Sequence, residues 1–454
     1  MAVDLNGVQA LVTTLYRRPI SRHLFFRFGD RASARAYLGE LAHGVTMAGG
    51  TLDAAPDPLL NVGVTYDGLA ALGMDPALLA KLDAVFKRGP LAVQLSLGDV
   101  PGSPSDPVSW WDGQFSTADV HCIVHVYARS DDAVQDATHT VRELAHRNGL
   151  TELFPRRDGS TLEGRSLGGA QLHFGYTDGI SHPDVCWDDD IPPAPSQVDF
   201  RNFLLGYSTR EYPSAPAGGP AADFVRGSTY GVFRWLYQDV AAFNLFLSTE
   251  GPKLFPELAV ADAEELLAAK MMGRWRDGTP LVLSPDRPDP RLANSNDFGY
   301  VTQDLDGCRC PFSAHIRVVN PRDTPLDPAE VEGVPRVLRR GMAYGPPLQG
   351  NTDDGVDRGL VGVFLCADLR KQIYTLTSWI MRNNFSPVYD ANRRVQDPLF
   401  GNRAMPGASA DFTLPAAGGG ATVKNLPDFV RTKGTAFLLY PGKTTLTALS
   451  KVIS

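Results

Sequence analysis

Residues 121–148 read HCIVHVYARSDDAVQDATHTVRELAHRN, and this stretch combines a strand pattern with a helix pattern. Its first seven residues are rich in β-branched and aromatic side chains, which is typical of a strand. The remainder places Val134, Ala137, Val141 and Leu144 on one stripe of an amphipathic helix. The stretch therefore predicts a strand that passes directly into a helix, as part of a mixed α and β fold.

The same pattern precedes this stretch. Residues 22–29 predict a strand, residues 32–43 a helix and residues 59–65 a second strand. Together with residues 121–148, the order is strand, helix, strand, strand, helix. This order is typical of a split βαβ, or ferredoxin-like, unit.

A related order recurs in the second half of the chain. Residues 313–319 and 360–367 predict strands, and residues 369–383 predict a helix. We therefore predict an α+β protein made of two ferredoxin-like halves with antiparallel sheets, although no sequence repeat is visible.

A segment rich in Asp and Pro, residues 188–196, lies between the halves. Proline removes a backbone donor and interrupts both ladders and helices, so this segment predicts a linker. We expect an N-terminal domain over residues 1–195 and a C-terminal domain over residues 196–454. A chain of 454 residues is long enough for two such domains.

Composition excludes several classes of protein. The net charge of −8 argues against a nucleic-acid-binding surface. The first residues lack the pattern of a signal peptide, and no apolar stretch is long enough to span a membrane. The five cysteines are odd in number and scattered, which suits free thiols in a reducing compartment, so a cytoplasmic location is expected.

No short motif of a common enzyme class is present. Zincin, α/β-hydrolase, P-loop and strand-linked dinucleotide-binding motifs are all absent. Cys308 and Cys310 are spaced too closely for a zinc knuckle and have no second pair. His121 and His125 share one face of a predicted strand, but no third ligand lies near them in the sequence, so they are interpreted as core residues.

The loop His-Phe-Gly-Tyr-Thr-Asp-Gly-Ile-Ser at residues 173–181 holds one carboxylate, Asp178, between two glycines. Glycine allows positive φ and close backbone approach, so the loop can direct this carboxylate at a cavity. Taken alone, the same residues also describe an ordinary surface turn.

Two later clusters carry further polar groups. His315 lies in a predicted strand that ends at Asn320-Pro321, and Arg339-Arg340 precede Gly341. Adjacent arginines suit the binding of carboxylates or phosphates. Taken alone, the histidine also fits a core position and the arginines a solvated surface.

The three clusters occur in the order and with the neighbours found in the dye-decolourising peroxidases, a family of haem peroxidases that this chain resembles. The matching motifs are Gly175-Tyr176-Thr177-Asp178-Gly179, Ala314-His315-Ile316-Arg317 followed by Asn320-Pro321-Arg322, and Arg339-Arg340-Gly341 followed by Tyr344-Gly345. The resemblance extends over nearly the whole chain, and the length indicates the longer subgroup. It implies that the C-terminal half holds the cofactor, haem b.

The resemblance also implies roles for single residues. His315 matches the proximal ligand of the haem iron, and Asp397 is the candidate carboxylate that orients its ring. Asp178 matches the distal residue that moves a proton between the two oxygens of hydrogen peroxide.

Three arginines complete the implied site. Arg339 matches the distal arginine by its spacing to Met342-Ala343-Tyr344-Gly345, with Arg340 as the alternative, and the fixed charge of this arginine stabilises the departing hydroxide. The other arginine of the pair, expected to be Arg340, and Arg322 are expected to pair with the haem propionates. His182 stands where relatives often carry an uncharged polar residue, a difference expected to alter access or proton supply.

The implied activity is reduction of hydrogen peroxide through a high-valent iron-oxo intermediate, with oxidation of dyes, phenols or similar small aromatic donors. A carboxylate that titrates near pH ~4 in its ordinary state predicts faster turnover in acid. The resemblance also implies that bulky donors, which cannot easily reach a buried haem, are oxidised at surface aromatics linked to it by electron transfer; the candidate relay residues are Tyr344, Trp379, Tyr374, Trp235 and Tyr237. The resemblance leaves open whether the protein forms a homo-oligomer.

Two alternatives remain at this point. A protein of the same fold can carry haem or release its iron without peroxidase turnover. A ferredoxin-like module can also bind a small metabolite or a protein partner without haem.

Overall fold

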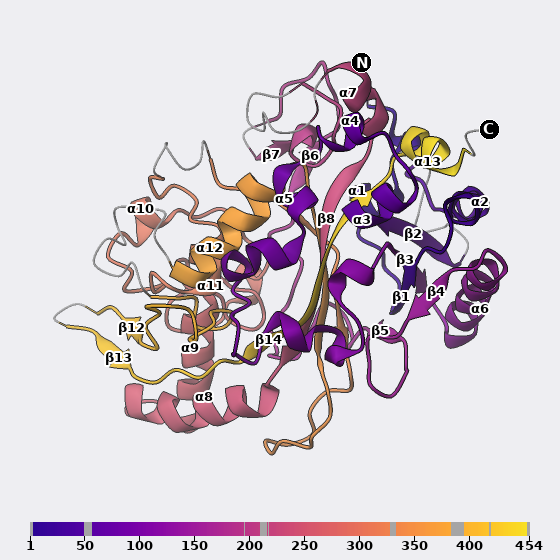
Figure 1. Ribbon diagram of the computed structural model, residues 1–454. Helices are drawn as coiled ribbons and strands as arrows, with labels where there is room; N and C mark the ends of the chain where they lie inside the picture. The colour runs from indigo at the N-terminus through magenta and orange to yellow at the C-terminus, as the bar shows by residue number, and fades with distance from the viewer. Residues whose placement is uncertain are drawn as a thin grey trace.

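The computed structural model describes residues 3–49, 57–194, 196–208, 216, 218–326, 333–382, 395–416 and 419–451. Its centre is a ten-stranded sheet with helices on both sides, as Figure 1 shows. The strand order is β10-β11-β8-β14-β2-β3-β1-β4, with β5 beside β1 and β9 beside β11.

The N-terminal half contributes one end of this sheet. Its elements are β1 (Ile20–Arg27), α2 (Arg31–Leu41), β2 (Leu59–Val64), β3 (Cys122–Ala128), α6 (Asp131–Arg147), β4 (Thr151–Leu153) and β5 (Leu162–Arg165). The order β2-β3-β1-β4, with antiparallel neighbours, is that of a split βαβ unit. The elements predicted around residues 121–148 are therefore confirmed.

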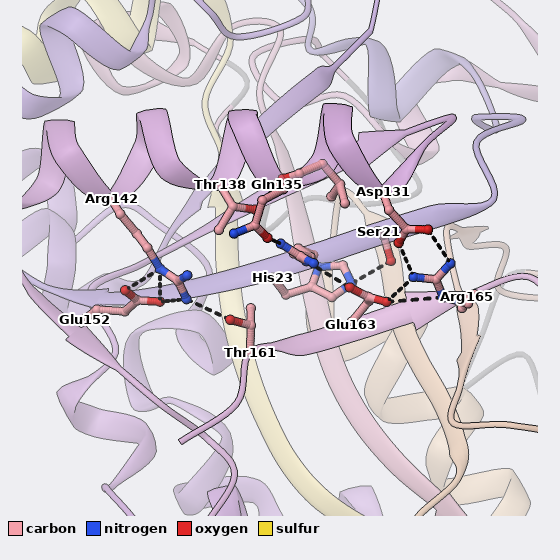
Figure 2. Close-up of polar contacts among 12 residues, drawn as sticks. Ser21, His23, Asp131, Gln135, Thr138, Arg142, Glu152, Thr161, Glu163 and Arg165 are labelled. Atoms are coloured by element: carbon pink, nitrogen blue, oxygen red, sulfur yellow. Dashed lines mark hydrogen bonds and ion pairs between the residues drawn. The ribbon is translucent and has the colours of Figure 1, made fainter. Parts of the chain in front are cut away.

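Helix α6 is fixed over this half-sheet by its charged side chains. Figure 2 shows Arg142 reaching Glu152 of β4, with Nη2 2.8 Å from Oε1, and also Thr161 at 2.7 Å. At the other end of the helix, Asp131 pairs with Arg165 of β5 at 2.5 Å. The side chain of Ser130 accepts from the Ala133 amide and caps the first turn.

The C-terminal half repeats the plan. Its strands are β8 (Thr229–Gln238), β9 (Leu338–Arg339), β10 (Met342–Tyr344), β11 (Gly359–Cys366) and β14 (Val430–Tyr440). The order β10-β11-β8-β14 is again antiparallel throughout, so both predicted ferredoxin-like halves are confirmed. Only β11 of these strands was predicted from the sequence.

The two half-sheets join through β14 and β2, which pair at Leu439 and Val64. The buried Gln9 side chain strengthens this junction, because its amide donates to Val62 O at 2.8 Å and to Pro441 O at 3.1 Å. The inner faces of both half-sheets contribute to one apolar core, which includes Phe25, Ile123, Phe233, Val363 and Leu438. The halves therefore fold around a shared interior.

Helices of the C-terminal half cover the outer face of its sheet and lie on the left in Figure 1. They are α8 (Val240–Leu254), α9 (Val260–Met272), α10 (Tyr300–Gln303), α11 (His315–Val319), a π-helix over Leu369–Tyr374 and α12 (Thr375–Arg382). The helix predicted over residues 369–383 is thus present, although residue 383 lies outside the described residues.

One predicted strand is wrong. Residues 313–319 are rich in β-branched side chains, yet His315–Val319 form the short helix α11. The buried Arg317 explains the difference, because its guanidinium donates to Asp304 Oδ2 at 2.9 Å and to Cys310 O at 2.7 Å. This segment packs against α9 and α12, and no described strand pairs with it, so the backbone forms local bonds such as Val318 N to Ala314 O.

The linker predicted over residues 188–196 connects two short parallel strands, β6 (Asp184–Cys186) and β7 (Gln197–Asp199). Residue 195, where the predicted domain boundary falls, lies outside the described residues, and the boundary stays a prediction. None of the described helices is long and apolar enough to cross a membrane. The remaining elements are α1 (Ala10–Thr13), α3 (Tyr66–Ala71), α4 (Pro76–Leu79), α5 (Ala84–Arg88), α7 (Gly219–Val225), β12 (Phe412–Leu414), β13 (Ala421–Val423) and α13 (Lys443–Ser450), with short 3₁₀ turns between some of them.

Candidate active site

A cavity of about 350 Å³ lies between the sheet of the C-terminal half and the helices that cover it. Strands β8 and β11 supply apolar walls, and the π-helix and α12 supply more. The apolar lining includes Val232, Leu236, Phe364, Ile373, Leu376, Ile380 and Met381. Cavities of this size and apolar character, with a few convergent polar groups, are typical of cofactor sites.

His315 lines this cavity from the first residue of α11. Its Nδ1 lies 2.6 Å from Oδ2 of Asp397, which is fully buried. The other carboxylate oxygen accepts from the amides of Leu399 at 2.8 Å and Phe400 at 3.1 Å. Because Nδ1 donates to this fixed carboxylate, Nε2 keeps a lone pair that can bind a metal.

Asp178 and Arg339 line the same cavity and form an ion pair, with Nη1 3.1 Å from Oδ1. Gly175 and Gly179 both adopt positive φ, at 85° and 86°, and produce the turn that carries Asp178. The Asp178 amide donates to Ala170 O at 2.9 Å. The loop is therefore a wall of the cavity, and its interpretation as an ordinary surface turn is replaced.

Arg322 also lines the cavity. Its Nη1 donates to Asn296 O at 2.7 Å, and the guanidinium carbon lies 3.6 Å from the centre of the Phe298 ring. Its buried Nε has no hydrogen-bond partner among the described residues. The backbone of Arg322 has a φ of 56°, a left-handed conformation that is uncommon outside glycine and often marks functional sites.

Arg340 is placed apart from the other candidates. Only 5% of the residue is exposed, and it does not line the cavity. Its guanidinium donates to Leu11 O, Val12 O and His182 Nε2 at 2.6 to 2.8 Å. The expected contact of Arg340 with a haem propionate does not fit this placement, because its donors already serve buried acceptors of the protein.

Sequence reasoning missed Arg234, which lines the cavity from the middle of β8. Its Nη2 lies 2.6 Å from Oδ1 of the buried Asp99, whose pKa burial raises to about 6. The sequence does contain a pattern that predicts this placement. Val232, Arg234 and Leu236 alternate along an apolar strand and must share one face, so Arg234 points to the same side as two apolar residues.

The other histidines and cysteines do not form a metal site. Among the described residues, no three His, Cys, Asp or Glu side chains are arranged to hold a metal ion. His125 is fully buried and contacts His23 Nδ1 at 2.8 Å and the Tyr440 hydroxyl at 2.8 Å, as expected for a core residue. His121 accepts from the Phe28 amide at 3.0 Å.

The groups around the cavity fit a haem. A neutral imidazole backed by a carboxylate suits its iron, apolar walls suit the ring, and arginine side chains suit its carboxylates. His315, Asp178, Arg339 and Arg322 all line one cavity, and Asp397 stands directly behind His315.

Comparison with known proteins agrees with this geometry. A family model described as the DyP dimeric alpha+beta barrel domain matches residues 7–154. A dye-decolorizing peroxidase of Mycena epipterygia is 29% identical over 408 residues, which are 85% of this chain and 73% of that protein. Dye-decolorizing peroxidase msp1 of Mycetinis scorodonius is 28% identical over 484 residues, 100% of this chain and 88% of that protein.

Solved structures share the fold as well. A dye-decolorizing peroxidase in complex with 2,6-dimethoxyphenol has a TM-score of 0.80 and 25% identity, and the match covers 99% of this chain and 100% of that one.

Proposed function

The chain belongs to the dye-decolourising peroxidase family, and from this premise we propose that haem b binds in the cavity and that hydrogen peroxide is the oxidant. The protein is a peroxidase that oxidises dyes and phenols. One observation carries the proposal: a single cavity is lined by His315, with Asp397 behind it, and by the Asp178–Arg339 ion pair.

His315 and Asp397 form the proposed metal-binding side. When bound, haem supplies a redox-active iron that can take oxidising equivalents from a peroxide. Nε2 of His315 would hold this iron, and Asp397 keeps the ring oriented by accepting from Nδ1. Because the carboxylate is itself held by two backbone amides, the imidazole has little freedom to rotate.

Asp178 and Arg339 form the proposed peroxide-binding side. The Asp178 carboxylate accepts a proton from one oxygen of hydrogen peroxide and returns it to the other, so that water can leave. The Arg339 guanidinium stabilises negative charge on the departing oxygen and holds the carboxylate at 3.1 Å. Arg322 remains the proposed partner of a haem carboxylate, supported by its place in the cavity wall and its unpartnered Nε.

Small aromatic donors are the proposed electron source, since the structural relative described above was solved with a dimethoxyphenol. For bulky donors, Tyr344 and Trp235 are proposed as the inner, buried steps of an electron-transfer relay between the cavity and the surface. Both are fully buried, with ring centres 6.1 Å apart, and Trp235 lies between the cavity-lining residues Arg234 and Leu236. The Tyr344 hydroxyl donates to Asp357 Oδ1 at 2.9 Å, so oxidation of this phenol has a proton acceptor in place.

A cytoplasmic location is also proposed. All five cysteines are free thiols, and four of them are buried. Free buried thiols are compatible with a reducing compartment.

The experiment is a comparison of Asp178→Ala and His315→Ala with the unmodified protein. Asp178→Ala is expected to keep a Soret band of full intensity and to lose peroxide-dependent oxidation of a chromogenic phenol. His315→Ala is expected to lose haem from the cavity. Full turnover by Asp178→Ala would refute its role in proton transfer and favour a haem carrier, and unchanged haem content in His315→Ala would refute the ligand assignment.

A further inference from the structure

The loop that carries Asp178 contacts the arginine pair at two points; Arg339 is the last residue of β9 and Arg340 follows it. Arg339 Nη1 lies 3.1 Å from Asp178 Oδ1, and Arg340 Nη1 lies 2.6 Å from Nε2 of His182. Adjacent residues on an extended chain point to opposite sides, so the two arginines hold positions 178 and 182 of the loop from two directions.

Arg340 is a fixed anchor for this contact. Its Nε donates to Leu11 O at 2.6 Å and its Nη2 to Val12 O at 2.8 Å, both at the N-terminal segment. Its backbone amide donates to Val363 O at 2.7 Å in β11. Nη1 also donates to Arg339 O at 3.0 Å. Because every guanidinium nitrogen of Arg340 forms a hydrogen bond, the group is fixed in one position. His182 is the side chain of the loop that accepts from it.

The contact requires a neutral His182. An imidazole accepts a hydrogen bond only through an unprotonated nitrogen, so Nε2 must keep its lone pair and Nδ1 must carry the hydrogen. The surroundings favour this state, because burial and the charges of Arg340 and Arg339 lower the pKa of His182 to about 4, while Asp178 opposes them. Arg336 is a further cation that acts in the same direction.

We propose that His182 is a positioning residue for peroxide activation: by accepting from Arg340 it holds the loop so that Asp178 stays within reach of Arg339. The proposal rests on the roles proposed above for Asp178 and Arg339. His182 itself does not line the cavity, so it acts through the loop.

The residues between Asp178 and His182 are held independently by Asn296. The Ile180 carbonyl accepts from Asn296 Nδ2 at 2.8 Å, and Ser181 Oγ donates to Asn296 Oδ1 at 2.8 Å. These bonds keep the loop attached when the contact of His182 is removed. We therefore expect a shift of the carboxylate and retention of the fold, and displacement by about 1 Å is enough to slow a reaction by on the order of 10²-fold.

The test uses two amides of different reach. In His182→Gln the side-chain oxygen can occupy the position of Nε2 and accept from Arg340. In His182→Asn the amide ends near the position of Nδ1 and cannot reach the guanidinium. His139→Asn, at an exposed position on α6, controls for the loss of an imidazole elsewhere.

Three quantities are measured for each variant: haem content, kcat/KM for hydrogen peroxide, and hydrogen–deuterium exchange of the peptide that spans residues 176–183. His182→Asn is expected to lower kcat/KM by about tenfold to a hundredfold and to speed exchange in this peptide, with haem content unchanged. His182→Gln is expected to restore most of both. Faster exchange is also expected in the haem-free protein, where activity plays no part.

The inference is wrong if His182→Asn leaves kcat/KM and exchange unchanged, or if Gln behaves like Asn. Asp178→Asn and Arg339→Leu separate this outcome from failure of the proposed function. If those two variants retain full peroxide activation, the proposed roles fail. If they lose it while His182→Asn does not, the inference about His182 alone is refuted.

Discussion

Replacing Asp397 by asparagine tests the proposed metal-binding side most directly. The carboxylate has two oxygens in use: Oδ2 accepts from His315 Nδ1 at 2.6 Å, and Oδ1 accepts from the amides of Leu399 and Phe400. An asparagine has a single oxygen. If the asparagine oxygen accepts from the two buried amides, the asparagine NH₂ group faces Nδ1 of His315. Nδ1 must then be unprotonated, so that it can accept a hydrogen bond from this NH₂ group.

The tautomer that results is the wrong one for a metal. With Nδ1 as an acceptor, the hydrogen lies on Nε2, the atom that would bind iron. A hydrogen bond to a charged group contributes about 1.5–3 kcal/mol. Since each ~1.4 kcal/mol is a factor of ten, Asp397→Asn is expected to weaken haem binding by about 10- to 150-fold. The assay is titration of haem-free protein with haem, followed by the Soret absorbance.

Asp83→Asn is the matched control. Asp83 is also a buried carboxylate that accepts from two backbone amides, those of Val85 at 2.6 Å and Phe86 at 2.9 Å, where it caps α5 in the N-terminal half. It contacts no candidate metal ligand, so this variant is expected to lower the melting temperature and leave haem affinity unchanged. A haem affinity of Asp397→Asn within twofold of the unmodified protein would refute the reasoning.

Three further predictions concern the fold. Tyr440→Phe leaves Nε2 of the fully buried His125 without its partner and should cost about 1–3 kcal/mol in urea denaturation at pH 7; a cost below about 0.5 kcal/mol contradicts it. Gly231→Ala places a Cβ against the Tyr440 ring and should cost about 1–3 kcal/mol, seen as a lower melting temperature; an unchanged value would refute the overlap. Burial lowers the pKa values of His23, His125 and His182 below 6.5, so the unfolded chain binds more protons in acid, and each costs about 1.4 kcal/mol per pH unit below 6.5. The raised pKa of Asp99 offsets one of them below pH 6, and a net loss of ~4–5 kcal/mol is expected between pH 7 and pH 5; equal urea midpoints at both would contradict it.

Local sequence patterns were sufficient to predict the main helices and strands of the N-terminal half. Helices α2 and α6 follow their hydrophobic periodicity closely, because each has one face packed in a core and the other outside it. Strands β1, β2 and β3 are buried on nearly their whole length, with side chains in a core on either face, so they stand out in the sequence as short apolar runs. The strand predicted at residues 360–367 follows for the same reason, since the residues of β11 alternate between the shared interior and the cavity.

The short helix α11 could not be predicted in this way. Its β-branched residues favour a strand locally, and what decides against one is the distant Asp304, which holds Arg317. Asp397, 82 positions after His315 in the chain, is likewise brought beside it only by the tertiary fold. Contacts at such separation leave no periodic signal in a single sequence.

The alternation of side chains along β9 distinguishes Arg339 from Arg340 as the arginine that faces the cavity. Arg339 lies in β9 directly after Leu338, and alternation along an extended chain puts Leu338 and Arg340 on one face and Arg339 on the other. Leu338 is buried in the apolar core shared by the two halves, so Arg340 must also point inward. A buried guanidinium needs fixed acceptors, which here are carbonyls of the N-terminal segment and His182. The arginine on the other face meets Asp178 at the cavity. The position of Leu338 therefore predicts that Arg339 faces the cavity and that Arg340 faces inward, where it anchors the loop.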